Sequence, residues 1–276
     1  MSLFQYTFFV NALIGILIIS IAAGIIGTYI TTRRMVSISG GITHACFGGL
    51  GLGYFLGVSP IVMAGVFAVA SSFGVEWLSR RYRVREDSAI AVVWALGMAI
   101  GILFVFLTPG YVPELNSFLF GNILTISTAD IVAFGIYTAA LVALFIARGR
   151  QIVMIAFDRD FARIAGLPVR TISVIMTVMI ALAIVLTIRM VGIMLLLSML
   201  SLPPMIAEIF AARFKTIMTG AVAVSAATCA GGIIASAYIN VPCSAVIVIL
   251  QVVVYGLSRV AAGVIARHNK KRLADV

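Results

Sequence analysis

The 276-residue chain has little of what a soluble protein carries on its surface. Only 10% of its residues are charged, whereas 63% are hydrophobic, and no polar stretch is long enough to fold alone. Several apolar runs reach the roughly 18–20 residues that cross a bilayer. Because backbone groups in lipid must pair within the protein, this composition excludes a soluble enzyme and predicts an all-α, polytopic membrane helical bundle.

Residues that carry chemistry are also scarce: 2 histidines, 3 cysteines and 9 acidic residues. Cys46, Cys229 and Cys243 lie in apolar stretches at no metal-ligand spacing, and three cysteines give no disulfide framework. We interpret them as small buried side chains. The sequence Gly-x-x-x-x-Gly-Lys-Ser/Thr is absent, so the chain has no phosphate-binding loop with which to hydrolyse ATP.

The net charge of +10 arises from short basic clusters at the ends of apolar runs, as the positive-inside rule requires, so it indicates topology and not nucleic-acid binding. Every Lys and Arg except Arg189 falls on one side if the N-terminus is outside and the C-terminus is cytoplasmic. The predicted count is about 8–9 transmembrane helices in one domain over residues 1–276, with a basic cytoplasmic tail at 267–276. The expected spans are 5–30, 35–57, 61–78, 88–107, 131–147, 169–188, 192–208, 217–238 and 243–265.

Two segments leave this count ambiguous. Tyr111 to Asp130 is irregular, and its apolar run is too short to cross, so we interpret it as an outer loop or a partly inserted segment. Pro203 and Pro204 stand late in the seventh span, where they are expected to break its hydrogen bonding.

The stretch from Met35 to Gly57 is apolar yet carries polar side chains and seven glycines. Gly49-x-x-x-Gly53-x-x-x-Gly57 predicts close helix packing on one face. His44 is the candidate contact for a translocated substrate, since an ionisable side chain in a span faces protein or water and imidazole binds first-row metals. The alternative is a histidine that only fixes helix packing. Residues that share its stretch are candidates to line the path: Ser39, Gly40, Thr43 and Cys46.

A short cytoplasmic helix is predicted between the fifth and sixth spans. Asp158 is a good N-cap, and Asp160 places negative charge where the helix dipole favours it. Gly166 suits a left-handed C′ position and Pro168 stops continuation. The helix, Arg159 to Ala165, exposes Phe161 for docking against another protein. The alternative is a helix lying on the membrane interface.

These motifs resemble the permeases of bacterial ABC importers for zinc, manganese or iron. Phe157-Asp158-x-Asp160-Phe161-Ala162-x-x-x-Gly166-x-Pro168 is similar to the loop that docks onto the ATPase in that family. The run from Ser39 to Cys46 resembles its second-span motif Gly-Asp-Ala-Leu-Ser-His-Ser, and Leu119 to Leu124 resembles Leu-Phe-Gly-(Asp/Asn)-Ile-Leu. Val191-Gly192 and Leu202-Pro203 match a further Val-Gly…Leu-Pro region.

The resemblance implies a permease subunit of the bacterial inner membrane, not an enzyme, that translocates a divalent metal ion and has no covalently bound cofactor. Its implied partners are cytoplasmic P-loop ATPase subunits that bind the ATP, a second copy in a homodimer, membrane lipid and an extracytoplasmic metal-binding protein. It also implies coupling through residues 158–166 and their neighbours, namely Asp158, Asp160, Phe161, Ala162, Gly166 and Pro168. The extracytoplasmic protein is expected near Tyr111–Asn122, Arg189 and Asn240.

One departure concerns the ligands. The family's aspartate, one turn before the histidine, aligns with Gly40, and a lone imidazole is a weak cation site. The other carboxylates near spans, Glu76 and Glu208, are expected to pair with nearby arginines. The alternative function is a motor-independent secondary transporter or channel, although no paired broken helices are evident. A membrane-embedded enzyme is less favoured, because His44 has no carboxylate or nucleophile at helical spacing.

Overall fold

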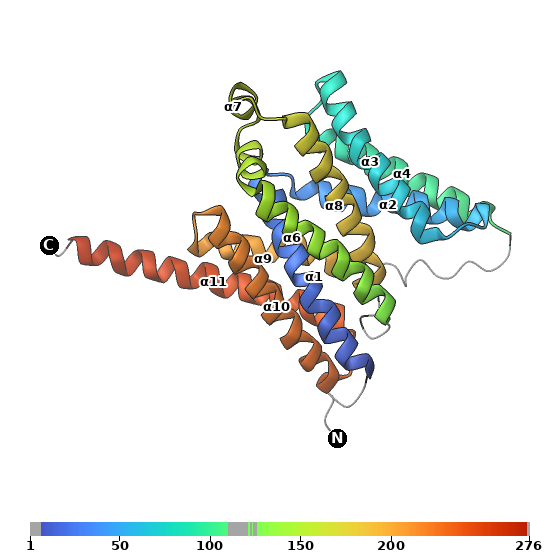
Figure 1. Ribbon diagram of the computed structural model, residues 1–276. Helices are drawn as coiled ribbons and strands as arrows, with labels where there is room; N and C mark the ends of the chain where they lie inside the picture. The colour runs from blue at the N-terminus through green and yellow to red at the C-terminus, as the bar shows by residue number, and fades with distance from the viewer. Residues whose placement is uncertain (1–6, 110–120, 122, 124–125, 275–276) are drawn as a thin grey trace.

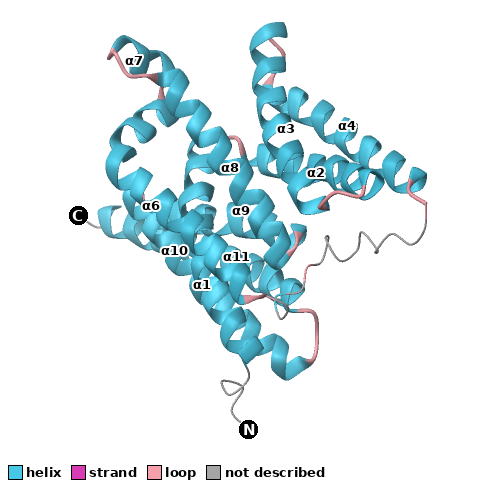
Figure 2. Cartoon of the chain, turned by 45° about the vertical axis from the view of Figure 1, so that its right-hand side comes forward, coloured by secondary structure: helices cyan, strands magenta, loops and turns pink. Residues whose placement is uncertain are grey.

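The computed structural model describes residues 7–109, 121, 123 and 126–274, apart from the side chains of Arg80 and residues 266–274. Throughout this part of the chain the regular structure is helical, and short turns connect most helices (Figure 2). The helices are α1 (Thr7–Thr32), α2 (Val36–Leu56), α3 (Pro60–Tyr82), α4 (Glu86–Leu107), α6 (Thr128–Phe157), α7 (Arg159–Ile164), α8 (Val169–Val191), α9 (Ile193–Phe210), α10 (Phe214–Ile239) and α11 (Cys243–Ala274).

Among the described helices, 8 are long and apolar enough to cross a membrane. α2 is not one of them, because its glycines, hydroxyls and His44 lower its mean hydropathy, yet it is 21 residues long and mostly buried. The protein shields this polar helix from lipid with its more apolar neighbours. The predicted all-helical membrane architecture of about eight or nine crossings is therefore confirmed.

Most of the segment from Tyr111 to Asp130, expected as an outer loop or a partly inserted segment, lies outside the described residues. Its end differs from the expectation, because α6 begins at Thr128 and not at Ile131. The Asp130 N–H donates to the Ser127 hydroxyl at 3.2 Å, and the Ser127 N–H donates to the Asp130 carboxylate at 3.3 Å. This reciprocal capping box starts the helix before the apolar run does.

The same helix also extends beyond the end of the expected span. α6 continues to Phe157, well past Ala147, where the apolar run stops. Arg148 and Arg150 end the lipid-compatible stretch but are good helix formers, so the helix itself continues beyond them. α6 therefore carries the chain directly to α7.

Pro203 and Pro204 do not break α9, which runs from Ile193 to Phe210. A proline cannot donate to the carbonyl four residues earlier, which for Pro204 is that of Leu200. The Leu200 carbonyl oxygen faces Gly27 of α1 so closely that a Cβ on this glycine would lie 2.5 Å from it. The helical hydrogen bond to this carbonyl is lost, as expected, yet the helix continues, with Gly27 of α1 packed against the carbonyl.

The glycines of α2 allow it to pack against two helices at once. A Cβ on Gly49 would lie 2.3 Å from the Met63 carbonyl oxygen of α3, and one on Gly53 would lie 2.6 Å from the Pro60 Cα. Gly57 has a different role from the packing predicted for it: with φ of +66° it is the left-handed C-cap that ends α2.

The opposite side of α2 meets α4. A Cβ on Gly97 would lie 2.5 Å from the Ala45 Cα, and one on Gly101 would lie 2.4 Å from the Phe47 carbonyl oxygen. Both α4 glycines are buried. Side chains at these positions would force the helices apart, so Gly97-x-x-x-Gly101 acts as a packing motif.

The helices form two groups on either side of α8 (Figure 1). α2, α3 and α4 pack closely together, while α1, α6, α9, α10 and α11 make the other group. α8 contacts α3 from the first group and α6 and α9 from the second. α7 and the turn between α3 and α4 lie at the same end of the molecule, whereas α1 begins at the other end, as both views show.

Candidate functional site

His44 lies on the only open strip of the central part of α2. From Ile38 to Gly51 every residue is buried except Gly40 and His44, which are partly exposed. Residues four apart in a helix lie on the same face. The two positions that the family resemblance aligns with an aspartate and a histidine therefore form one strip at the surface of this chain.

The imidazole of His44 is held by an aromatic neighbour on α4. Its ring stacks on Trp94 with centroids 4.5 Å apart and an interplanar angle of 6°, and Phe47 lies 6.4 Å away on α2. The Nδ1 atom is buried and has no hydrogen-bond partner within the described part of the protein. The exposed part of the ring, and not Nδ1, is the part of His44 that a ligand could reach.

Trp94 was missed by the sequence analysis. A signal existed, because Trp94 precedes Gly97 by three residues and so lies on the face of α4 that packs against α2. Its indole N–H points to the Met98 sulfur at 2.9 Å, which fixes the ring beside His44.

The hydroxyl residues of the same stretch face the interior. Ser39 donates to the Val36 carbonyl at 2.7 Å, and Thr43 donates to the carbonyl of Ser39. Cys46 and Thr43 border a small cavity between α2, α3, α8 and α9. These three side chains, predicted as candidates to line the path, lie on a different side of α2 from His44.

Gly40 has room for a side chain. A Cβ added there would meet Leu197 of α9 at 3.8 Å, an ordinary van der Waals contact. At the adjacent Gly41 a Cβ would lie only 2.3 Å from the Ile90 Cγ2. The strip can therefore accommodate a ligand beside His44 at position 40 but not at position 41.

No group of three or more His, Cys, Asp or Glu residues capable of holding a metal occurs within the described ranges. A divalent cation at His44 would need ligands beyond this chain's acidic and sulfur side chains, such as backbone carbonyls, water or a second subunit. The expectation that Glu208 pairs with an arginine is wrong for this part of the chain, where its carboxylate makes no ion pair.

Arg189, at the far end of α8 from α7, has a partner that the sequence analysis did not predict. Its Nε donates to the Asp130 carboxylate at 2.7 Å, which ties the end of α8 to the start of α6. Asp130 uses its other carboxylate oxygen in the capping box of α6. The charge of Arg189 is thereby neutralised.

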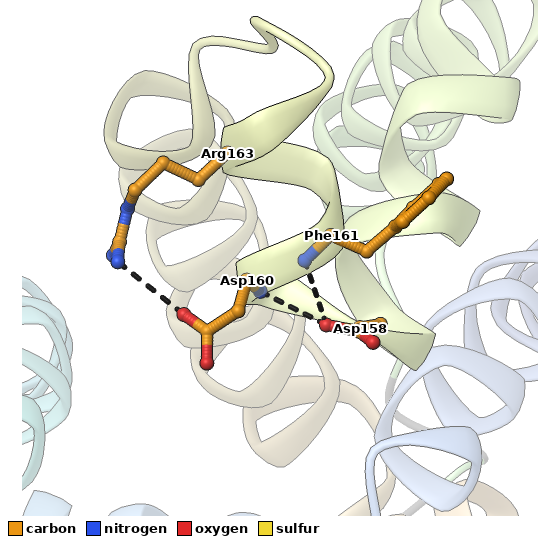
Figure 3. A network of polar contacts seen from close by, with 4 residues as sticks. All are labelled: Asp158, Asp160, Phe161 and Arg163. Atoms are coloured by element: carbon orange, nitrogen blue, oxygen red, sulfur yellow. Dashed lines mark hydrogen bonds and ion pairs between the residues drawn. The ribbon is translucent and has the colours of Figure 1, made fainter.

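The second candidate site is α7, whose predicted local structure is confirmed. The Asp158 carboxylate accepts hydrogen bonds from the N–H groups of Asp160 at 3.0 Å and Phe161 at 2.9 Å (Figure 3). Arg163 forms an exposed ion pair with Asp160 at 3.3 Å. Gly166 has φ of +75°, the left-handed conformation expected just beyond the helix.

The two sides of α7 differ in exposure. Phe161 is 57% exposed and Ile164 is 86% exposed, whereas Ala162 is fully buried. Pro168 is the N-cap of α8, so the chain turns from α7 into α8 within a few residues. Two large apolar side chains held outward by a capped helix make a compact surface suited to contact with another protein.

Comparisons with known proteins agree over nearly the whole chain. Residues 5–262 match the ABC 3 transport family. A "probable metal transport system membrane protein" of Chlamydia trachomatis is 34% identical over 87% of this chain and 84% of its own length. The manganese transport system membrane protein MntC of Halalkalibacterium halodurans is 27% identical over 93% of this chain and 88% of its own length.

A solved structure agrees as well. PsaBC from Streptococcus pneumoniae in complex with a Fab contains a chain that matches with a TM-score of 0.81 and 26% identity, covering 93% of this chain and 92% of that one. The chain described here is a member of the ABC 3 transport family.

Proposed function

We propose that this chain is the membrane-spanning permease subunit of an ATP-driven importer in the bacterial cytoplasmic membrane, with a divalent transition-metal ion (zinc, manganese or iron) as its cargo. The family match and the metal transport systems named among its relatives support this class of function. The observation that carries the cargo assignment is the imidazole of His44, which is partly open on the otherwise buried central part of α2. Imidazole nitrogen is a ligand suited to such ions.

The strip of Gly40 and His44 faces outward from this subunit. A cation there is incompletely surrounded by one chain, so the path runs between two copies in a homodimer, each contributing one strip. The stacked Trp94 holds the imidazole at the wall of this path. Ions move along such a path only if each contact is weak enough to release them. A site without a carboxylate at position 40 meets this condition.

Energy reaches the path through α7. The chain has no phosphate-binding loop, so ATP hydrolysis belongs to separate cytoplasmic subunits. Phe161 and Ile164 form the contact with those subunits, and the Asp158 N-cap stabilises the helix that carries them. Residues 158–166 therefore act as the coupling helix of a single permease domain.

The orientation follows from charge. α7 and the turn between α3 and α4 share one end of the molecule, and that turn is flanked by Arg81, Arg83 and Arg85. We assign this end to the cytoplasm, with the N-terminus outside. An extracytoplasmic metal-binding protein docks at the opposite end, where Arg189 is paired with Asp130.

The experiment is uptake of radiolabelled zinc, manganese and iron by cells that contain the complete importer. His44→Ala should lower uptake of the cargo metal at least about tenfold, the loss expected for one liganding group. Thr43→Val, a buried change on the side of α2 away from His44, should leave uptake near wild type. Wild-type rates for all three metals in His44→Ala, at equal protein in the membrane, would return His44 to a packing role.

A further inference from the structure

A narrow cavity lies where the two groups of helices meet α7. Its volume is about 30 Å³, enough for about two water molecules. Its walls come from several elements and include Ile42 of α2, Glu76 of α3, Glu86 of α4, Arg159 of α7 and Arg33, which follows α1. The cavity thus brings the coupling helix, both acidic residues and the helix of His44 to one place.

The side chains of α7 divide into those that face away from the protein and one charged side chain that faces in. Phe161 and Ile164 are exposed and form the apolar docking surface, whereas Arg163 is exposed and pairs with Asp160. Arg159, at the first position of α7, is only partly exposed and lines the cavity. One short helix therefore combines an outward docking surface with an inward cation.

Arg159 places a charged side chain of α7 in the same cavity as side chains of α3 and α4. The backbone of α7 packs on α6 and α8. Glu76 and Glu86 belong to α3 and α4, in the group that also holds α2 and His44. Arg159 is the residue that α7 contributes to the wall of the cavity that Glu76 and Glu86 also line.

The other basic residue of the cavity, Arg33, follows the last residue of α1. Its guanidinium lies 5.7 Å from the centre of the Tyr29 ring of α1 and donates to the Tyr29 hydroxyl at 3.2 Å. Arg33 is therefore held against α1. Arg159 and the two carboxylates line a cavity that is partly shielded from water, and this shielding strengthens the attraction between their charges.

We propose that Arg159 is a positioning residue that transmits movement of α7 to the group formed by α2, α3 and α4, and so to His44. This inference rests on the proposed function, since it assumes that an ATPase moves α7. When α7 is displaced, the Arg159 charge draws Glu76 and Glu86 with it. Docking and transmission are then carried by different side chains of the same helix.

The test separates these two roles in the purified importer, with its ATPase bound, reconstituted in proteoliposomes. Arg159→Gln keeps a polar side chain but removes the charge. It should bind the ATPase with wild-type affinity, while the number of metal ions transported per ATP hydrolysed falls about tenfold, the effect of losing one charge-assisted contact. Arg159→Lys should recover part of this ratio.

Two matched variants complete the design. Arg163→Gln changes an exposed arginine on the same helix and should keep the wild-type ratio. The double variant Glu76→Gln/Glu86→Gln should lower the ratio as Arg159→Gln does. Thermal unfolding of each variant in detergent shows whether it is folded, and only variants that unfold at the wild-type temperature are compared.

A wild-type ratio in Arg159→Gln would overturn the inference and leave the proposed function intact. Loss of ATPase binding in Arg159→Gln would also overturn it, because Arg159 would then be a docking residue like Phe161. Absence of ATP-dependent metal uptake in the wild-type assembly would instead overturn the proposed function.

Discussion

Replacing Gly40 with aspartate adds a carboxylate one helical turn before His44. Side chains four apart on a helix have their Cβ atoms about 5–6 Å from each other, so both can reach one cation. Position 40 has the space, since its Cβ would touch only Leu197 at 3.8 Å. We expect Gly40→Asp to fold and to bind divalent cations more tightly than the wild type.

The size of the gain follows from charge. Two unit charges 4 Å apart attract by about 4 kcal/mol at an effective dielectric constant of 20. Removing the carboxylate from water opposes part of this attraction. A net gain of about 1.4–2.8 kcal/mol remains, which corresponds to a ten- to hundredfold lower Kd. Transport should slow, because a cation held more tightly is released more slowly.

The assay is metal binding to purified protein in detergent, with a fluorescent chelator as competitor. Gly40→Asn is the matched control, since it adds nearly the same volume without the charge. Gly41→Asp should fold poorly, because its Cβ would lie 2.3 Å from Ile90. Equal cation affinity in folded Gly40→Asp and Gly40→Asn would refute the view that positions 40 and 44 share one site.

Three further predictions concern packing, capping and a buried polar network. Gly101→Ala should lower the unfolding temperature, because its Cβ would lie 2.4 Å from the Phe47 carbonyl oxygen. The expected cost of this overpacking is about 1–3 kcal/mol. Gly135→Ala is the control and should not lower the unfolding temperature, since its Cβ would meet nothing within 4 Å. Asp158→Ala should cost about 0.5–2 kcal/mol of local helix stability and weaken ATPase binding in a pull-down assay, whereas Asp158→Asn should retain binding. Gln251→Leu should destabilise the fold by about 1–3 kcal/mol, measured by thermal unfolding, because the fully buried amide joins α9, α10 and α11; unchanged unfolding would show that the amide is dispensable.

Much of the fold could be predicted from the sequence because lipid leaves few alternatives for the backbone. Apolar runs located the spans, and Asp158 and Gly166 located both ends of α7, since caps depend on local geometry. The ends of helices that extend beyond the apolar runs were harder to predict from the sequence. α6 extends beyond the end of its apolar run at Arg148. Hydropathy indicates where the lipid-compatible stretch ends, whereas a helix can continue outside lipid.

The candidate site was only partly predictable. The face of α2 that meets each neighbour depends on packing between residues distant in sequence, so Ser39 and Thr43 could not be separated from His44 in advance. The close packing of Gly27 of α1 against the Leu200 carbonyl of α9 joins residues distant in sequence, which no local pattern reveals. The interaction between Arg189 and Asp130 likewise joins helices that the sequence does not place together.

The most direct measurement is accumulation of radiolabelled metal in proteoliposomes that contain the permease with its ATPase. Accumulation should require ATP, and Phe161→Glu, which places a charge on the exposed docking surface of α7, should abolish it while the permease remains inserted. Equal accumulation without the ATPase, or with Phe161→Glu, would show that this chain does not take its energy through α7.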